Sequence, residues 1–229
     1  MDRTIQPSLL AFNPKIIEQQ LQTCANHGIT WIHYDVMDHI YVNNKAFDLE
    51  YIDLIVKNNM KVAVHLMTKN VVEQTQKYLT QNVNAIMIHP DADISSNIDY
   101  ALSLIKAKKE VKAGIAIKYF ANLHQLLPYF KKVDIVLVMG VPPGFGGQKY
   151  HSYTTTKLKQ LKQLKDEFNY HFQIVLDGGV NQNVVAQVKN EVDIFVTGTY
   201  LMNATNFTTT YQNLLFLANQ KIGFQQTES

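Results

Sequence analysis

Short apolar runs rich in β-branched residues alternate along the chain with longer segments in which apolar residues recur at helical spacing. A strand followed by a helix, repeated many times, is the pattern that builds a parallel sheet through crossover connections. The alternation occurs eight times. We therefore predict eight strands, each followed by a helix, over Ile5 to Leu10, Trp31 to Met37, Val62 to Met67, Ala85 to His89, Ala113 to Lys118, Asp134 to Val141, Gln173 to Asp177 and Asp193 to Thr197.

The positions of the glycine-rich turns indicate how these units are arranged. An open nucleotide-binding sheet has such a turn after its first strand, where this chain reads Ala11-Phe12-Asn13-Pro14. The glycine-rich turns instead follow the sixth, seventh and eighth predicted strands, where closed barrels commonly bind phosphate. The sequence therefore predicts an α/β fold, a (β/α)8 TIM barrel, as a single domain over residues 1–229 with a polar tail from about residue 225.

The first predicted helix carries recognisable signals at both ends. Asn13 can cap a helix, Pro14 suits a first turn, and Gly28 can reverse the chain after His27. We expect the first helix between these points and the last helix from Asn206 to Gln220.

Composition and charge narrow the class of partner. The chain is 46% hydrophobic and 17% charged, with a formal net charge of +2, so it lacks a basic field that would attract nucleic acid or an anionic membrane. No apolar run approaches the ~20 residues that span a bilayer, and we expect no signal peptide, because the first residues lack an apolar h-region. We expect a cytoplasmic protein whose single Cys24 packs in the core. The outer helix faces leave open whether it forms a homo-oligomer.

Polar side chains gather at strand ends, where a plain barrel core would hold Val, Ile and Leu. The period of two places His33, Asp35 and Met37 on one face of the second strand, and this face is expected to be the barrel interior. His65 ends the third strand in the same way and Asp177 ends the seventh. Two imidazoles and two carboxylates suit one divalent metal ion such as Zn, Fe, Mn or Co.

A further histidine, His89, ends the fourth strand without an inward carboxylate beside it. We interpret it as a hydrogen-bonded core residue or as a residue that supports a ligand.

Three adjacent loops can expose backbone donors to an anion. They contain Gly144-Phe145-Gly146-Gly147, Gly178-Gly179 and Gly198-Thr199. Glycine lets an anion approach the backbone without a side chain in the way. Their convergence predicts a phosphate site, beside which Met37, Met67 and Met139 are expected to form a water-poor collar.

The chain resembles the ribulose-phosphate 3-epimerase family over nearly the whole barrel, from Pro7-Ser8-Leu9-Leu10 to Gly198-Thr199. No single motif decides the resemblance, but the order and spacing of several are specific. The motifs are Trp31-Ile32-His33-Tyr34-Asp35-Val36-Met37-Asp38, Val64-His65-Leu66-Met67, Lys112-Ala113-Gly114-Ile115-Ala116-Ile117-Lys118, Pro143-Gly144-Phe145-Gly146-Gly147-Gln148 and Leu176-Asp177-Gly178-Gly179-Val180.

The resemblance implies an isomerase of the pentose phosphate pathway that epimerises D-ribulose 5-phosphate to D-xylulose 5-phosphate at carbon 3. It implies that Asp35 and Asp177 exchange protons with the substrate on opposite faces of that carbon, through an enediolate. It also implies that these two residues hold a metal together with His33 and His65. The implied substrate-binding residues are Ser8, Met37, His65, Met67, Met139, Gly144, Phe145, Gly146, Gly147, Asp177, Gly178, Gly179, Gly198 and Thr199.

Departures from the family pattern lie near the site. The family usually continues Met-Asp with Gly-His-Phe-Val-Pro-Asn, and this chain has His39-Ile40-Tyr41-Val42-Asn43-Asn44. Tyr119 stands where proline is usual, Pro142 where a polar residue is usual and Thr199 where serine is common.

Two alternatives stay open. The motifs fix poorly the polar groups that read sugar length, so the substrate could be a related ketohexose phosphate such as allulose 6-phosphate. The other alternative is a catalytically silent sugar-phosphate-binding barrel, against which the retention of both aspartates and both histidines argues. Decarboxylation, which related barrels carry out, would need a cationic lysine that the inward cluster does not offer.

Overall fold

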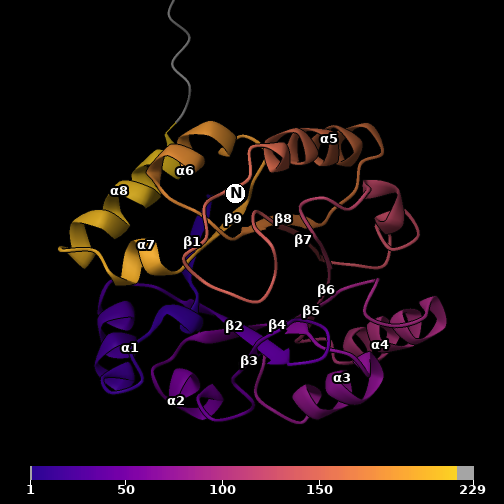
Figure 1. The fold of residues 1–229 in the computed structure, drawn as a ribbon, viewed down its shortest axis with the longest axis horizontal. Helices are drawn as coiled ribbons and strands as arrows, with labels where there is room; N and C mark the ends of the chain where they lie inside the picture. Colours follow the sequence, from indigo (N-terminus) through magenta and orange to yellow (C-terminus); the bar gives the residue numbers. More distant parts are fainter. Residues whose placement is uncertain (1, 221–229) are drawn as a thin grey trace, which may run out of the picture.

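The computed structural model describes residues 2–220, and the tail expected from about residue 225 lies outside them. Within this range, nine strands form one sheet in the order β1-β9-β8-β7-β6-β5-β4-β2-β3. The strands are β1 (Thr4–Pro7), β2 (Trp31–Asp38), β3 (Lys45–Ala46), β4 (Lys61–Met67), β5 (Ala85–Ile88), β6 (Lys112–Ile117), β7 (Ile135–Met139), β8 (Gln173–Asp177) and β9 (Ile194–Thr197). Figure 1 shows their arrangement.

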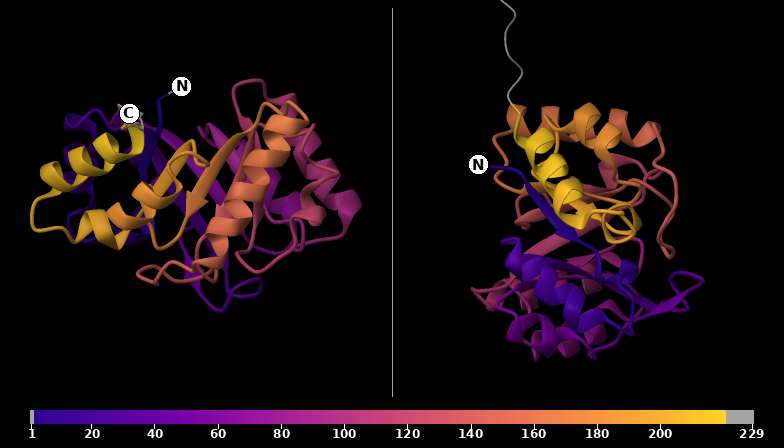
Figure 2. Two further views of the ribbon diagram at one scale, coloured as in Figure 1. Left: turned by 90° about the horizontal axis from the view of Figure 1, so that it is seen from above. Right: turned by 90° about the vertical axis from the view of Figure 1, so that its left-hand side faces the viewer.

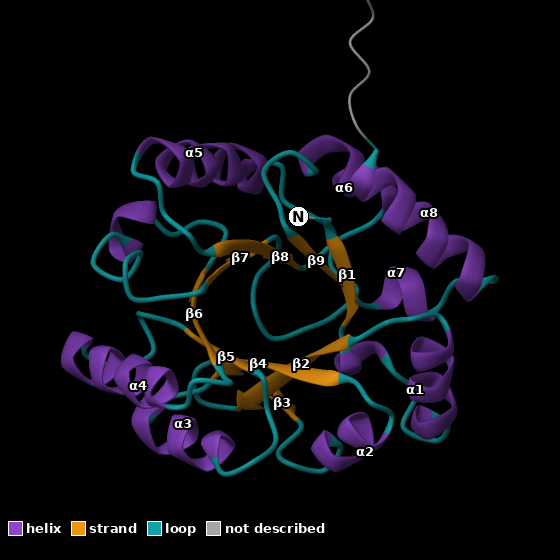
Figure 3. Ribbon diagram, turned by 180° about the vertical axis from the view of Figure 1, so that it is seen from behind, coloured by secondary structure: helices purple, strands orange, loops and turns teal. Residues whose placement is uncertain are grey.

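The sheet closes on itself. Every neighbouring pair is parallel except β2 and β3, which pair antiparallel at the end of β2. A parallel bridge between Ser8 and His33 joins the end of β1 to β2, and the strands form a ring surrounded by helices (Figure 3). This arrangement confirms the predicted (β/α)8 barrel, with β3 as a short addition.

The α-helices lie outside the ring of strands, as Figure 3 shows. They are α1 (Ile17–Asn26), α2 (Ile52–Lys57), α3 (Val71–Leu79), α4 (Ser95–Ala107), α5 (Tyr153–Glu167), α6 (Gln182–Val188), α7 (Thr199–Met202) and α8 (Phe207–Asn219). The prediction of a helix after every strand needs one correction. The segment after β6 forms only a short 3-10 helix at Leu123–Leu126, followed by buried turns around Tyr129 and Phe130.

The alternation of side chains along each strand produces two buried layers. Tyr34 and Val36 pack between the sheet and the helices, whereas Met37, Met67 and Met139 belong to a separate cluster inside the barrel. The period of two therefore assigned the faces of β2 correctly.

The predicted ends of two helices had different outcomes. The first strand ends at Pro7, a 3-10 helix follows at Leu9–Ala11, and α1 begins at Ile17 and not near Asn13-Pro14. Asn13 Oδ1 accepts a hydrogen bond from the Lys15 amide, 3.1 Å away, in the turn before the helix.

The last helix, α8, lies within the expected range, and the Asn206 side chain caps it by accepting from the Thr209 amide at 2.9 Å. At the other end of α8, Asn219 Oδ1 accepts from the Arg3 amide at 2.8 Å, and Asn219 Nδ2 donates to the Arg3 carbonyl at 3.0 Å. These bonds attach α8 beside the start of β1 (Figure 2).

Candidate metal and sugar-phosphate site

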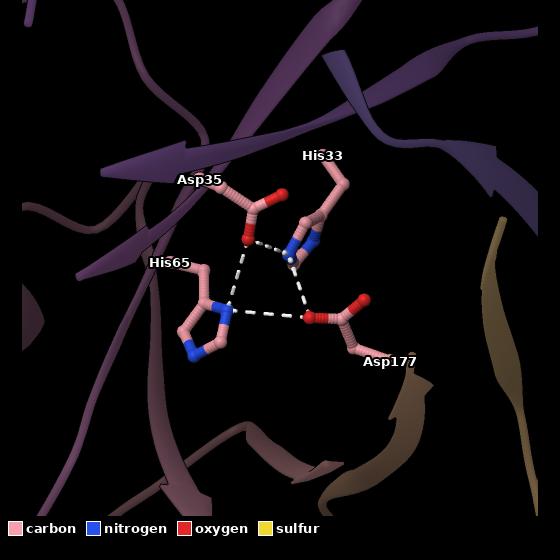
Figure 4. A group of neighbouring side chains, drawn as sticks. All are labelled: His33, Asp35, His65 and Asp177. Carbon is pink, nitrogen blue, oxygen red and sulfur yellow. Dashed lines mark hydrogen bonds and ion pairs between the residues drawn. The ribbon is translucent and has the colours of Figure 1, made fainter. Parts of the chain in front are cut away.

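Four side chains meet inside the barrel in a closed ring of contacts, drawn in Figure 4. His33 Nε2 lies 3.3 Å from Asp35 Oδ1 and 3.6 Å from Asp177 Oδ2. His65 Nδ1 lies 3.3 Å from the same Asp35 oxygen and 3.4 Å from the same Asp177 oxygen. The two histidines therefore face the two carboxylates in alternation.

Strand pairing explains how residues so distant in sequence meet. Asp35 on β2 and His65 on β4 are direct partners in the parallel register, so their side chains point into the barrel next to each other. His33 lies two residues earlier on β2 and shares the inward face of Asp35. Barrel closure then places Asp177, at the end of β8, opposite these two strands.

The carboxylates control the protonation of the histidines. Burial alone would lower the pKa of His33, but the negative charges of Asp35 and Asp177 outweigh it and raise the pKa to about 10. For His65, burial likewise acts downward, and hydrogen bonds with Asp177 and Asp35 raise the pKa above its usual value. The pKa values of both aspartates are lowered, because the neighbouring histidines overcome the effect of burial.

These residues fit a divalent cation. One nitrogen or oxygen from each lies within 4.8 Å of those of the other three, and all four residues are buried. Among the described residues, neither ring nitrogen of His33 has a hydrogen-bond partner, although both atoms are buried. Within residues 2–220, no lysine or arginine forms an ion pair with Asp35 or Asp177. A buried set of two imidazoles and two carboxylates with no lysine or arginine paired to it has the donor atoms that suit a transition-metal ion.

The outer oxygens of the two carboxylates differ in their surroundings. Asp35 Oδ2 accepts a hydrogen bond of 2.8 Å from Ser8 Oγ. The second oxygen of Asp177, Oδ1, accepts no hydrogen bond from any residue that the structure describes. Both aspartates contribute to the wall of the cavity described next.

A cavity of about 360 Å³ opens beside the four residues, at the ends of the strands. It has the size of small-molecule sites in proteins. Most of the substrate-binding residues expected from the sequence line it: Ser8, Met37, Met67, Met139, Phe145, Gly146, Gly147, Asp177, Gly178, Gly179, Gly198 and Thr199. The structure therefore gathers the three glycine-containing loops and the three methionines around one space.

Three expected site residues lie off this wall. His33 and His65 are fully buried. Gly144 belongs to the loop after β7 but does not line the cavity. Eight lining residues were not expected as site residues. Leu10, Gln148 and Val180 lie in the family motifs, whereas Ala11, Val141, Asn181, Val196 and Tyr200 carried no distinctive sequence signal. These residues lie at the ends of strands or in the loops that follow, so their positions in the predicted barrel could have suggested them. Their residue types could not.

Two adjacent glycines after β8 are required by close packing. A Cβ on Gly178 would lie 2.5 Å from Val141 Cγ2, and one on Gly179 would lie 2.5 Å from the Tyr150 amide nitrogen. Both residues also have positive φ, at 104° and 70°. A side chain at either position would push apart the loops that form the cavity.

The altered loop after β2 reaches across to the loop after β7. Asn44 Nδ2 donates to the Gly144 carbonyl at 2.6 Å, and Val42 is buried against the same glycine. His39, which stands where the family usually has glycine, adopts a left-handed conformation with φ of 68°. The chain therefore keeps a glycine-like turn without the glycine.

His89 contacts the site through His65. It follows β5, is fully buried, and its Nε2 lies 2.9 Å from His65 Nε2. Burial lowers the pKa of His89 well below its usual value, and the positive charges of His65 and Lys118 act in the same direction. The structure thus places His89 behind His65 and outside the ring of four residues.

Comparison with known proteins identifies relatives over most of the chain. The model of the "Ribulose-phosphate 3 epimerase family" matches residues 4–202. The ribulose-phosphate 3-epimerase of Mycoplasma genitalium is 36% identical over 197 residues, which cover 85% of this chain and 88% of that protein. The Buchnera aphidicola protein of the same name is 31% identical, with 91% of this chain and 92% of that protein covered.

Solved structures with little sequence identity share the fold. KGPDC from Streptococcus mutans superposes with a TM-score of 0.68 at 11% identity, covering 95% of this chain and 98% of that one. Orotidine 5'-phosphate decarboxylase from Pyrococcus horikoshii gives 0.65 at 10% identity, covering 95% and 100%. Among residues 2–220, no helix is long and apolar enough to cross a membrane. With the family model matched across the barrel and relatives above 30% identity over most of both chains, this protein belongs to the ribulose-phosphate 3-epimerase family.

Proposed function

We propose that the protein epimerises D-ribulose 5-phosphate to D-xylulose 5-phosphate at carbon 3, using Asp35 and Asp177 as the pair of proton-transfer groups. The observation that carries the proposal is the convergence of these two carboxylates, from β2 and β8, on one cavity. Membership of the family supports the choice of reaction.

The reaction inverts a carbinol carbon beside a ketone, so a proton must leave one face and another must return to the opposite face. Each transfer to a positioned carboxylate contributes roughly 10²- to 10⁴-fold to the rate. Asp177 Oδ2 lies within the ring of four, which leaves Oδ1 to face a substrate proton. Asp35 keeps Oδ1 in the ring, and Ser8 orients its Oδ2.

His33, Asp35, His65 and Asp177 would hold one divalent cation. Such a cation supplies positive charge that stabilises the negative charge developing on the substrate. The donor set suits Zn, Fe, Mn and Co, and it does not select among them.

The phosphate end of the substrate is assigned to the loops after β7, β8 and β9. Gly146, Gly147, Gly178, Gly179 and Gly198 line that part of the wall, where no side chain hinders the approach of phosphate oxygens to the backbone. Met37, Met67 and Met139 line the wall as apolar groups, and they exclude water from the reacting carbon.

Two alternatives are distinguished by substrate and by exchange. Polar residues that line the cavity, among them Gln148, Asn181 and Tyr200, could contact either a five-carbon or a six-carbon sugar. Allulose 6-phosphate therefore stays an alternative substrate. A silent sugar-phosphate-binding barrel would bind ligand without exchanging a proton. Decarboxylation is disfavoured, because Lys118 at the end of β6 pairs with Asp91 at 2.7 Å and does not line the cavity.

The test compares wild type with Asp177→Asn on both sugar phosphates, with bound metal quantified in each sample. We expect wild type to prefer D-ribulose 5-phosphate, and we expect the variant to lose roughly 10²-fold or more in kcat while it stays folded. Near-normal epimerisation by a folded Asp177→Asn variant would disprove the two-carboxylate assignment. A preference for allulose 6-phosphate would show that the same reaction acts on the longer sugar and that D-ribulose 5-phosphate is the wrong substrate.

A further inference from the structure

His89 makes a contact that barrel packing alone does not require. Its ring lies 5.1 Å from the His65 ring, at an angle of 30°, and the two Nε2 atoms are 2.9 Å apart. Both rings are fully buried. At this distance one nitrogen must donate and the other must accept, so the protonation of one ring determines that of the other.

We propose that His89 is a positioning residue that holds His65 in the tautomer and orientation needed for His65 to bind a cation through Nδ1. The proposal rests on the proposed function, because it assigns a role to His89 at the cation site formed by His33, Asp35, His65 and Asp177.

The direction of the hydrogen bond follows from the arrangement of the four residues. His65 Nδ1 faces Asp35 and Asp177, so this nitrogen must offer its lone pair to a cation. A neutral imidazole then carries its proton on Nε2. His65 Nε2 therefore donates, and His89 Nε2 accepts. A buried acceptor that fixes a ligand ring in this way also raises the basicity of the ligand.

The second nitrogen of His89 must carry the remaining proton. His89 Nδ1 is buried, has no hydrogen-bond partner among residues 2–220, and lies 4.0 Å from Asp91 Oδ1. A carboxylate at this distance favours an N–H over a bare lone pair on Nδ1. Asp91 thus biases His89 toward the tautomer in which Nε2 accepts from His65.

Asp91 is itself held by two groups. Tyr41 donates its hydroxyl to Asp91 Oδ1 at 2.7 Å, and Lys118 donates to Oδ2, also at 2.7 Å. The Tyr41 ring lies 5.2 Å from the His89 ring and 4.4 Å from Lys118 Nζ. Tyr41 stands in the altered loop after β2, where the family pattern has phenylalanine, so its hydroxyl links that loop to the support of His65.

The test measures Zn²⁺ affinity by competition with a chelator in the full-length protein. We expect His89→Leu to weaken binding by about 10- to 100-fold, the usual cost of losing a partner of a ligating histidine. His89→Gln restores an oxygen acceptor and should bind Zn²⁺ more tightly than His89→Leu. His27→Leu is the matched control, because His27 is hydrogen-bonded to the Thr23 carbonyl and to Thr208 Oγ1 away from the site; it should leave the affinity unchanged.

A second readout observes the tautomers directly. In the Zn²⁺-loaded wild type, ¹⁵N NMR of the imidazoles should show His65 protonated on Nε2 and His89 protonated on Nδ1. The opposite tautomer of His89, or equal Zn²⁺ affinity in wild type and His89→Leu, would overturn the proposal.

The Zn²⁺ affinity and the tautomers of His65 and His89 are measured without substrate turnover, so this test is separate from the test of the proposed function. A wild type that binds Zn²⁺ as described but does not epimerise would contradict the proposed function and leave the role of His89 supported. A wild type that binds no divalent cation would overturn both.

Discussion

The hydroxyl of Ser8 donates a hydrogen bond of 2.8 Å to Asp35 Oδ2 at the seam where the barrel closes. The same serine forms the parallel bridge to His33 that joins the end of β1 to β2. Ser8 and Asp35 are both buried. Closure of the barrel and orientation of one of the two carboxylates therefore depend on the same residue.

Ser8→Ala is expected to lower both stability and turnover. Removal of the hydroxyl leaves a buried, charged carboxylate oxygen without its donor, which costs about 1–3 kcal/mol in the free energy of unfolding. Without this hydrogen bond the Asp35 carboxylate is no longer held in one orientation, so kcat for the sugar phosphate should fall by a larger factor than KM rises. Urea denaturation and steady-state kinetics measure the two effects, with Ser8→Thr as the variant that keeps a hydroxyl. Equal kcat in wild type and Ser8→Ala would contradict the role given to this hydrogen bond.

The pKa of His33, raised to about 10, predicts how the metal-free protein responds to pH. Because the folded pKa exceeds the unfolded value of about 6.5, this group's contribution to stability is full below pH 6.5 and is lost as pH rises through 10. The melting temperature of chelator-treated protein should therefore fall between these limits.

Cation binding should show the opposite trend. A cation must displace the proton from His33, so apparent affinity should rise by up to about tenfold per pH unit for each proton displaced. Differential scanning calorimetry with and without Zn²⁺ between pH 6.5 and 9 compares the two trends. A gain in melting temperature on adding Zn²⁺ that shrinks with rising pH would contradict the assignment of His33 as a ligand.

His39→Gly should stabilise the loop after β2. His39 is exposed with a φ of 68°, a conformation that costs a residue with a Cβ about 1–2 kcal/mol. Glycine avoids that cost but gains entropy in the unfolded chain, which offsets roughly 0.5–1 kcal/mol. We therefore expect an increase of up to about 1.5 kcal/mol in the free energy of unfolding, seen as a higher urea midpoint at unchanged slope. His39→Ala keeps the Cβ and should show no increase; an equal change in both variants would exclude the backbone explanation.

The sequence predicted the barrel and the four inward residues because both depend on local periodicity. The spacing of two in His33, Asp35 and Met37 assigns these side chains to one face of a strand whatever the rest of the chain does. The glycine turns after the late strands pointed to closure by their place in the order of strands, and the structure shows that Gly178 and Gly179 occupy positions that exclude a side chain.

Features that depend on contacts between distant segments could not be predicted in this way. The helix α1 begins at Ile17 and not near Asn13, because residues 13–16 form a turn in which the Ile16 amide donates to the Asn13 carbonyl at 3.0 Å. The contact of His89 with His65 needs the pairing of β4 with β5, in which His65 is the direct partner of Met87, two residues before His89. The sequence shows a histidine at that strand end, and only the three-dimensional arrangement shows its partner.

The most direct test of the account follows carbon 3 of D-ribulose 5-phosphate by NMR in deuterated water, with metal-loaded protein and a chelator-treated control. The account predicts D-xylulose 5-phosphate that carries deuterium at carbon 3, formed with the loaded protein and lost in the control. If folded, metal-loaded protein gave no product and no deuterium exchange, that result would contradict the assignment of Asp35 and Asp177 as proton-transfer groups.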